Sequence, residues 1–114
     1  MKNVEVRFSR SAESAFQELV RRSSNEKCAR SILDAVNVKV GLLKENPHHG
    51  VPVAKRLVPR RYKSVGVRNL FRIALPSFWR MLYTITNEGE TLVVFVLDII
   101  NHEEYDKLFG YKKR

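Results

Sequence analysis

Two arginines, Arg72 and Arg80, stand in neighbouring strand-like runs in the middle of the chain. Apolar residues flank each arginine in the alternating pattern that is typical of a half-buried strand. Because successive side chains of a strand point to opposite faces, both guanidiniums are expected on one face of an antiparallel hairpin, away from the core. Arginines placed in this way favour a polyanionic ligand, so we expect function on this face.

The charge distribution points to the same part of the chain. The net charge is +9, and residues 46–87 contribute +8 of it, with eight Lys/Arg and no Asp/Glu. The flanking segments carry +3 in residues 1–45 and −2 in residues 88–114. Such a local field favours nucleic acid, an acidic protein or an anionic membrane surface. A face that is basic only for solubility is the plainer alternative, and a long block without one carboxylate argues against it.

A basic loop, residues 47–66, precedes the first arginine-bearing run. Three prolines and two glycines interrupt it, so we expect an irregular segment there. Long irregular loops in compact domains usually serve a function or are disordered, and the charge of this one favours function. The candidate nucleic-acid-binding residues in and just after it are Lys55, Arg56, Arg60, Arg61, Lys63 and Arg68.

Three strand-like runs begin at Asn69, Phe78 and Thr91 and are expected to form an antiparallel meander. The residues expected to face the core from the first two runs are Phe71, Ile73, Leu75, Trp79, Met81, Tyr83 and Ile85. The third run is apolar at both parities from Leu92 to Leu97. It is therefore expected to be a central strand that is covered on both faces.

The segment before the loop predicts a strand followed by two helices. Val4–Phe8 alternates as a strand does, and Ser11 is the expected N-cap of an amphipathic helix that extends to about Arg22. Ser23–Glu26 fits a capping box that would start a second helix, and Pro47 would end it. Two helices with so short a link form an αα-hairpin, which can cover one face of the sheet.

We therefore expect a single α+β domain over residues 1–114. It comprises an N-terminal strand, a two-helix hairpin, and a meander of three strands forming one sheet that the helices cover. A short C-terminal turn and tail, residues 101–114, would complete it, with Asn101 as the cap, Phe109 near the end of the turn and Gly110 as the stop.

Several classes of function find no support in the sequence. No apolar run approaches the roughly 20 residues that span a bilayer, and the N-terminus lacks the apolar stretch of a signal peptide. A single cysteine, Cys28, suits a reducing cytoplasm, and a buried structural thiol is its expected state. His48 and His49 lack a second cluster of metal ligands, so no metal site is expected.

Three segments in this order resemble the RelE/ParE superfamily of small toxins from toxin–antitoxin pairs. They are Asn69-Leu-Phe-Arg-Ile, Trp79-Arg-Met-Leu-Tyr and the end of the apolar run, Asp98-Ile-Ile-Asn-His. The resemblance extends from Val4 to about Phe109. It implies a microbial, cytoplasmic protein of compact α+β fold that a cognate antitoxin protein neutralises, and it implies no cofactor.

The RelE branch of this superfamily cleaves messenger RNA on the ribosome without a metal, by attack of a ribose 2′-hydroxyl on the adjacent phosphate. Carried over by position, the resemblance gives Arg80 the role of a phosphate-binding arginine and Arg72 that of a basic residue on the preceding strand. His102 matches a histidine of the final turn. Tyr105 falls near a tyrosine that follows the last strand, at a shorter spacing.

Two departures from the family pattern weaken the nuclease interpretation. Ala74 stands where active relatives often carry a second basic residue, and Glu103 stands where an arginine usually follows the histidine. Two alternatives therefore stay open. One is a catalytically silent relative that binds nucleic acid or an acidic protein, and the other is a ParE-like inhibitor of a type II topoisomerase. A homodimer or a toxin–antitoxin hetero-oligomer is possible in each case.

Overall fold

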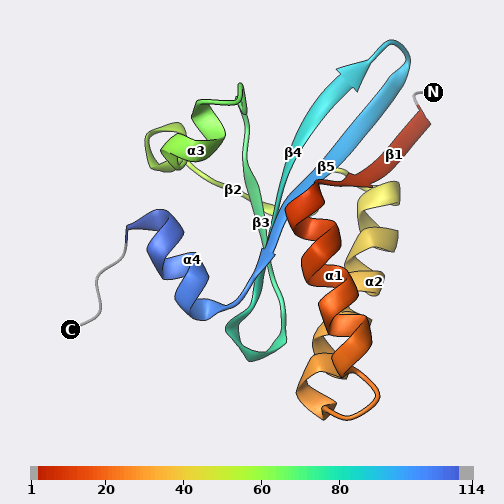
Figure 1. Cartoon of the computed structure of the whole chain (residues 1–114). Helices are drawn as coiled ribbons and strands as arrows, with labels where there is room; N and C mark the ends of the chain where they lie inside the picture. The colour runs from red at the N-terminus through yellow and green to blue at the C-terminus, as the bar shows by residue number, and fades with distance from the viewer. Residues whose placement is uncertain (1–2, 111–114) are drawn as a thin grey trace.

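The computed structural model describes residues 3–110, and the basic tail expected after Gly110 lies outside this range. One five-stranded sheet has helices on both of its faces (Figure 1). The elements are β1 (Asn3–Phe8), α1 (Arg10–Arg22), α2 (Lys27–Glu45), β2 (Val51–Pro52), the 3-10 turn η1 (Lys55–Leu57), α3 (Arg60–Lys63), β3 (Phe71–Ala74), the 3-10 turn η2 (Pro76–Phe78), β4 (Arg80–Glu88), β5 (Thr91–Ile100) and α4 (His102–Phe109). The expected α+β class is confirmed.

The strand order is β1-β5-β4-β3-β2. The predicted antiparallel meander is present as β3, β4 and β5. β1 pairs parallel with β5, from Asn3 opposite Thr91 to Phe8 opposite Val96, so the sheet is mixed. A two-residue strand, β2, pairs antiparallel with β3 at the opposite edge, and the sequence analysis did not predict it.

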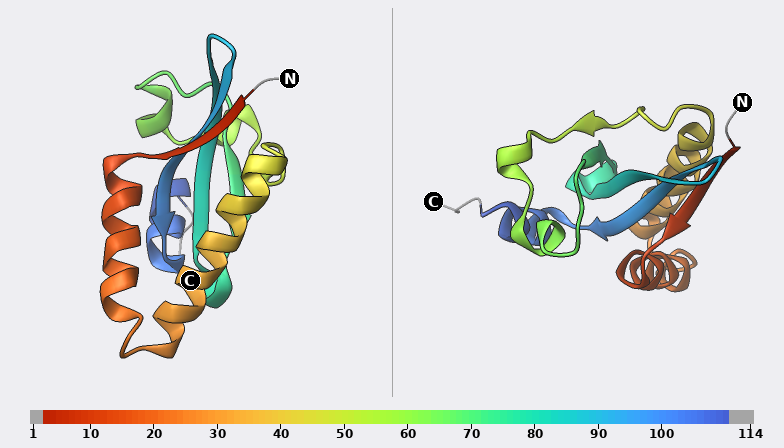
Figure 2. Two further views of the ribbon diagram at one scale, coloured as in Figure 1. Left: turned by 90° about the vertical axis from the view of Figure 1, so that its right-hand side faces the viewer. Right: turned by 90° about the horizontal axis from the view of Figure 1, so that it is seen from above.

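The helical hairpin α1–α2 covers one face of the sheet (Figure 2). The N-cap of the amphipathic α1 lies two residues earlier than expected, at Ser9 and not at Ser11. The Ser9 hydroxyl accepts from the Ala12 amide at 3.0 Å and donates to the Leu97 carbonyl at 2.6 Å. Ser9 therefore caps the helix and joins it to β5, which Ser11 could not do from inside the first turn.

The capping box expected at Ser23–Glu26 is absent. α2 begins at Lys27, and Glu26 occupies its N-cap position without a side-chain capping bond. The Glu26 carboxylate instead pairs with Arg22 at 2.7 Å. Because packing against the sheet buries Ala29, Ile32, Val36 and Leu43, α2 holds its position without that cap.

A second apolar cluster covers the other face of the sheet, where α3 and α4 pack (Figures 1 and 2). Val94 and Val96 of β5 face the helical hairpin, whereas Leu97 and Ile100 belong to the second cluster. The prediction of a central strand that is covered on both faces is thus confirmed. A β-bulge interrupts the pairing of β4 with β5. Leu82 is opposite Asp98 and Tyr83 is opposite Val96, so Leu97 has no partner of its own in the register.

The loop expected to be irregular at residues 47–66 contains three short regular elements, which corrects the prediction in part. Besides β2, it contains η1 and the short helix α3. Val58 and Tyr62 are buried in the second cluster. The buried Tyr83 hydroxyl donates to the Pro47 carbonyl at 2.7 Å and accepts from the Gly50 amide at 2.8 Å. These side chains fix a segment whose local sequence alone favours no regular structure.

Replacing Gly50 with alanine is expected to destabilise the fold by about 2 kcal/mol, because overpacking a rigid site is costly. A Cβ at this position would lie 2.8 Å from a ring carbon and from the hydroxyl oxygen of the fully buried Tyr83, and 3.0 Å from the Arg72 carbonyl oxygen. Urea unfolding measures the change.

The control is Gly41→Ala within α2, where a Cβ would have no atom within 4 Å. This change is expected to stabilise the fold by about 0.5–1 kcal/mol, since alanine has the higher helix propensity. Equal effects of the two substitutions would contradict the crowding at Gly50.

α4 follows β5 directly and has well-defined ends, as predicted. Asn101 and Glu104 form a reciprocal capping box, and Gly110 closes the helix with φ of 74°. The caps fix where α4 lies on the sheet and so position His102 and Tyr105. Within residues 3–110, no helix combines the length and the apolar character needed to cross a membrane.

Candidate functional site

Arg72 and Arg80 lie on the face of the sheet that α4 packs against. In the register of the sheet, Arg80 lies between Ala74 of β3 and Ile100 of β5. Arg72 is opposite Leu82, which belongs to the second apolar cluster with Tyr105. The alternation that placed both arginines on one face is therefore confirmed.

Tyr105 of α4 links the two arginines. Its hydroxyl accepts a hydrogen bond from Arg72 Nη1 at 3.2 Å, and its ring centroid is 5.4 Å from Cζ of Arg80. The residue is only 6% exposed, and its ring also packs against Phe109 at 4.6 Å. A phenol is thus placed between two cations, with its oxygen next to one guanidinium and its ring face next to the other.

No carboxylate of the described residues neutralises the charges of this pair. Within residues 3–110, neither Arg72 nor Arg80 forms an ion pair, and Arg80 Nη1 donates instead to the Trp79 carbonyl at 3.0 Å. Arg72 is exposed and Arg80 is half-buried. Their remaining N–H donors can therefore bind an anionic group that approaches this face.

His102 lies at the N-terminal end of α4, three residues before Tyr105. It is exposed, its Nε2 lies 3.4 Å from Asp106 Oδ2, and its ring centroid is 6.0 Å from that of Phe78. The i, i+3 spacing puts His102 and Tyr105 on neighbouring positions of one helix face. The four residues expected to act in catalysis are thus brought to one side of the molecule.

The candidate nucleic-acid-binding residues are all exposed. Lys55 and Arg56 lie on η1, Arg60, Arg61 and Lys63 on α3, and Arg68 just before β3. α3 packs on the same face of the sheet as α4, so its three basic residues lie on the side of the molecule that carries the arginine pair (Figure 1).

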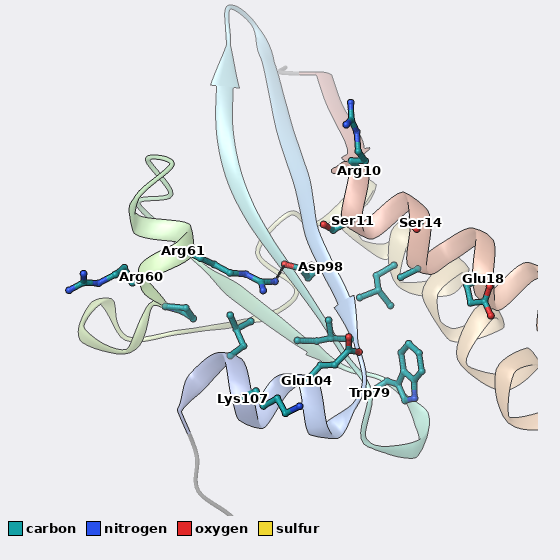
Figure 3. A pocket seen from close by; sticks show the side chains of 15 residues that line it. Arg10, Ser11, Ser14, Glu18, Arg60, Arg61, Trp79, Asp98, Glu104 and Lys107 are labelled. Atoms are coloured by element: carbon teal, nitrogen blue, oxygen red, sulfur yellow. Dashed lines mark hydrogen bonds and ion pairs between the residues drawn. The ribbon is translucent and has the colours of Figure 1, made fainter.

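Asp98 is the residue of this face that the sequence analysis did not single out. It is nearly buried, and its Oδ2 accepts from Arg61 Nη2 at 2.6 Å (Figure 3). The same oxygen accepts from the Tyr62 hydroxyl. One expected RNA-binding arginine is therefore partly committed to a carboxylate. The sequence does contain a signal for this cluster. Asp98 is the single acid in the otherwise apolar run of β5, and a buried charge requires polar partners.

A groove of about 1220 Å³ borders this cluster, between α1 and α4 (Figure 3). The pairing of β1 with β5 ends at Val96, so the last residues of β5 line the groove instead. Its charged residues are of both signs: Arg10, Arg60, Arg61 and Lys107 with Glu18, Asp98 and Glu104. The lining excludes Arg72 and Arg80, so the groove and the arginine pair are separate features of the structure.

The model of a protein family described as "ParE toxin of type II toxin-antitoxin system, parDE" matches residues 6–105. The chain belongs to this toxin family. A solved structure described as a YoeB/ParE toxin from Agrobacterium tumefaciens has the same fold, with a TM-score of 0.57 at 15% sequence identity. The match covers 86% of this chain and 98% of that one. No curated protein sequence matches the chain.

As a ParE-family member, the protein is the toxin of a type II toxin–antitoxin system, and the family implies a cognate antitoxin as its partner. The two departures from the family pattern are Ala74 and Glu103. Ala74 lies on the face of the sheet that carries Arg72 and Arg80, called here the arginine face, and Glu103 lies on the last helix. Ala74 is exposed and is the register partner of Arg80, and Glu103 is exposed beside His102. The arginine pair therefore lacks the further cations that the superfamily pattern suggests.

Within residues 3–110 of the toxin, no group of three or more His, Cys, Asp or Glu residues is placed to hold a metal ion. His48 packs edge-on against Phe71 at 5.7 Å. Cys28 was expected to be a buried thiol, and this is wrong. It is exposed at the start of α2, with its Sγ 3.1 Å from Ser77 Oγ, because the apolar stripe of the helix faces away from it.

Burial raises the pKa of Tyr62 well above its usual value near 10, and the hydrogen bond and charge of Asp98 raise it further. We expect Tyr62→Phe to lower the free energy of unfolding by about 2 kcal/mol at neutral pH, since it removes a hydrogen bond to a charged group. The folded toxin holds the Tyr62 proton more tightly than the unfolded chain. The stabilisation that the Tyr62 hydroxyl provides is therefore fully present below about pH 10 and declines as the pH rises further.

Urea unfolding of both proteins between pH 7 and pH 11 tests this expectation. The difference between wild type and Tyr62→Phe should be constant up to about pH 10 and then shrink by about 1.4 kcal/mol per pH unit. A difference that stays constant to pH 11 would show that Tyr62 does not hold its proton in this way.

Proposed function

We propose that this toxin is a metal-independent endoribonuclease that cleaves messenger RNA on the ribosome in the cytoplasm. The observation that carries the proposal is the position of Tyr105 between two arginines, with its hydroxyl beside Arg72 and its ring beside Arg80. Neither arginine has a carboxylate partner within residues 3–110. Cleavage of RNA by its own 2′-hydroxyl needs cations on the phosphate, together with a proton acceptor and a proton donor. The arginine face supplies groups of each kind.

In the proposed reaction, Arg80 and Arg72 bind the non-bridging oxygens of the scissile phosphate. The 2′-oxygen forms a bond to phosphorus as its proton leaves, and the bond from phosphorus to the 5′-oxygen breaks as that oxygen gains a proton. The products are a 2′,3′-cyclic phosphate and a free 5′-hydroxyl. The arginines stabilise the charge that develops on the phosphate, and Tyr105 and His102 are the candidate proton-transfer groups.

The cognate antitoxin, in this proposal, neutralises the toxin by covering the arginine face. Acidic side chains of an antitoxin segment would pair with the exposed residues of η1 and α3, where residues 46–87 contribute +8 to the net charge. Binding of this kind is expected to weaken as the salt concentration rises, because much of it is electrostatic.

A second candidate function is inhibition of a type II topoisomerase without RNA cleavage. Two observations favour it: the matching family model is that of ParE toxins, and Ala74 and Glu103 reduce the positive charge near the arginine pair. A third candidate is a catalytically silent relative that binds RNA or an acidic protein through the same face.

Two assays run in parallel on the purified toxin separate these candidates. One follows cleavage of end-labelled messenger RNA on programmed ribosomes, and the other follows DNA supercoiling by gyrase. Message cleavage without inhibition of gyrase is the expected result. Inhibition of gyrase with intact message would select the topoisomerase inhibitor, and salt-sensitive RNA binding with neither activity would select the silent relative.

A further inference from the structure

Phe78 has an unusual backbone conformation in the connection between β3 and β4. Ser77 and Phe78 are consecutive non-glycine residues in the left-handed region, with φ of 60° and 62°. This region is unfavourable for residues with a Cβ and especially for bulky ones. Such strain is often retained at functional sites. Phe78 is also 70% exposed, so burial of its ring does not account for the conformation.

Neighbouring contacts hold this turn in place. The Leu75 amide donates to the Trp79 carbonyl at 2.9 Å, and the Trp79 amide donates to the Pro76 carbonyl at 3.3 Å. The Ser77 hydroxyl is 3.1 Å from the Cys28 sulfur of α2. The turn therefore presents the Phe78 ring from a fixed backbone.

The ring lies next to the candidate site. Its centroid is 6.0 Å from that of His102, at an interplanar angle of 58°. His102 follows β5 two residues after Ile100, the register partner of Arg80. The β3–β4 connection accordingly lies beside the N-terminal end of α4 (Figure 1). Phe78 thus contacts His102 of α4, the helix on which Tyr105 lies beside the two arginines.

We propose that Phe78 is a stacking platform for a nucleobase that flanks the scissile phosphate of the RNA. Sites for single-stranded nucleic acid usually combine exposed aromatic rings with arginines, because the cations bind phosphates and the rings stack on unpaired bases. A purely apolar protein partner would not make use of the adjacent charges. This inference rests on the proposed endoribonuclease function and identifies where the substrate's base is held.

Single-turnover cleavage of end-labelled message on programmed ribosomes tests the inference. The variants are Phe78→Gly, which removes the ring and suits the backbone conformation, and Phe78→Trp, which retains an aromatic platform. Val38→Ala is the control, because Val38 is also exposed and apolar but lies on α2. Each protein is assayed on an intact message and on two messages with an abasic nucleotide immediately 5′ or 3′ of the cleaved bond.

We expect Phe78→Gly to cleave the intact message about tenfold or more slowly at subsaturating toxin, with Phe78→Trp and Val38→Ala within threefold of wild type. One abasic message should slow the wild type by a similar factor and leave Phe78→Gly with no further loss, since ring and base act as one pair. The thermal unfolding midpoint of Phe78→Gly should equal or exceed that of the wild type.

Cleavage by Phe78→Gly at the wild-type rate on the intact message would overturn the inference and leave the proposed function intact. Equal losses for wild type and Phe78→Gly on both abasic messages would also overturn it, because ring and base would then act independently. Absence of cleavage by the folded wild type would overturn the proposed function, and the inference with it.

Discussion

Arg80→Ala is expected to slow message cleavage by about 10²- to 10³-fold while the toxin stays folded. This is the usual loss when one fixed group that stabilises developing charge is removed. Arg80 is half-buried, has no carboxylate partner within residues 3–110, and is held beside the Tyr105 ring at 5.4 Å. Single-turnover kinetics on programmed ribosomes measure the change, and circular dichroism confirms the fold.

Two further variants separate a specific role of Arg80 from simple loss of charge. Arg80→Lys keeps the charge but not the planar fork of donors, so its activity should lie well below that of the wild type. Arg30→Ala removes one positive charge from α2, which packs on the other face of the sheet, and should cleave within threefold of wild type. Similar losses for Arg30→Ala and Arg80→Ala would indicate a non-specific electrostatic effect.

Tyr105→Phe is expected to slow cleavage by about 10²-fold, because a positioned proton-transfer group contributes at least this much. The substitution removes only the hydroxyl that accepts from Arg72 at 3.2 Å. The phenyl ring can keep its packing against Phe109 and beside Arg80, so the thermal unfolding midpoint should change little.

A small effect of Tyr105→Phe would contradict a role of the hydroxyl in proton transfer. Cleavage by Tyr105→Phe within threefold of wild type would show that the tyrosine only packs α4 against the sheet and spaces the arginines. Proton transfer would then pass to His102, and His102→Gln would show the larger loss.

The strands of the meander were predictable from sequence because their side chains meet two different environments. Alternation in β3 and β4 predicted Arg72 and Arg80 on one face, and the apolar pattern of β5 at both parities predicted a strand that is covered on both faces. These patterns reflect burial, which acts on every residue of a strand. The capping of α4 by Asn101 was predictable for a similar reason, since a capping box is a local interaction.

Features that depend on contacts between distant segments were not predictable in this way. The parallel pairing of β1 with β5 joins the two ends of the chain. The start of the 47–66 segment is held by the hydroxyl of Tyr83, which is more than thirty residues from Pro47 and Gly50. Likewise Ser9 rather than Ser11 caps α1, because its hydroxyl also reaches the Leu97 carbonyl of β5.

The candidate site shows the same division. Strand alternation predicted that the two arginines share a face, and the superfamily resemblance indicated His102 and Tyr105 as site residues. The distance from Tyr105 to Arg72 depends on how α4 packs on the sheet, and sequence alone does not give it. The cluster of Asp98 with Arg61 and Tyr62 was missed, because its members come from two segments that only the fold brings together.

Chemical analysis of the cleaved ends of a ribosome-bound message tests the central claim most directly. The wild-type toxin is predicted to leave a 2′,3′-cyclic phosphate on the upstream fragment and a free 5′-hydroxyl on the downstream one, and Arg80→Ala is predicted to leave the message intact under the same conditions. A message that stays whole with folded wild-type toxin, while gyrase supercoiling is blocked, would contradict the claim.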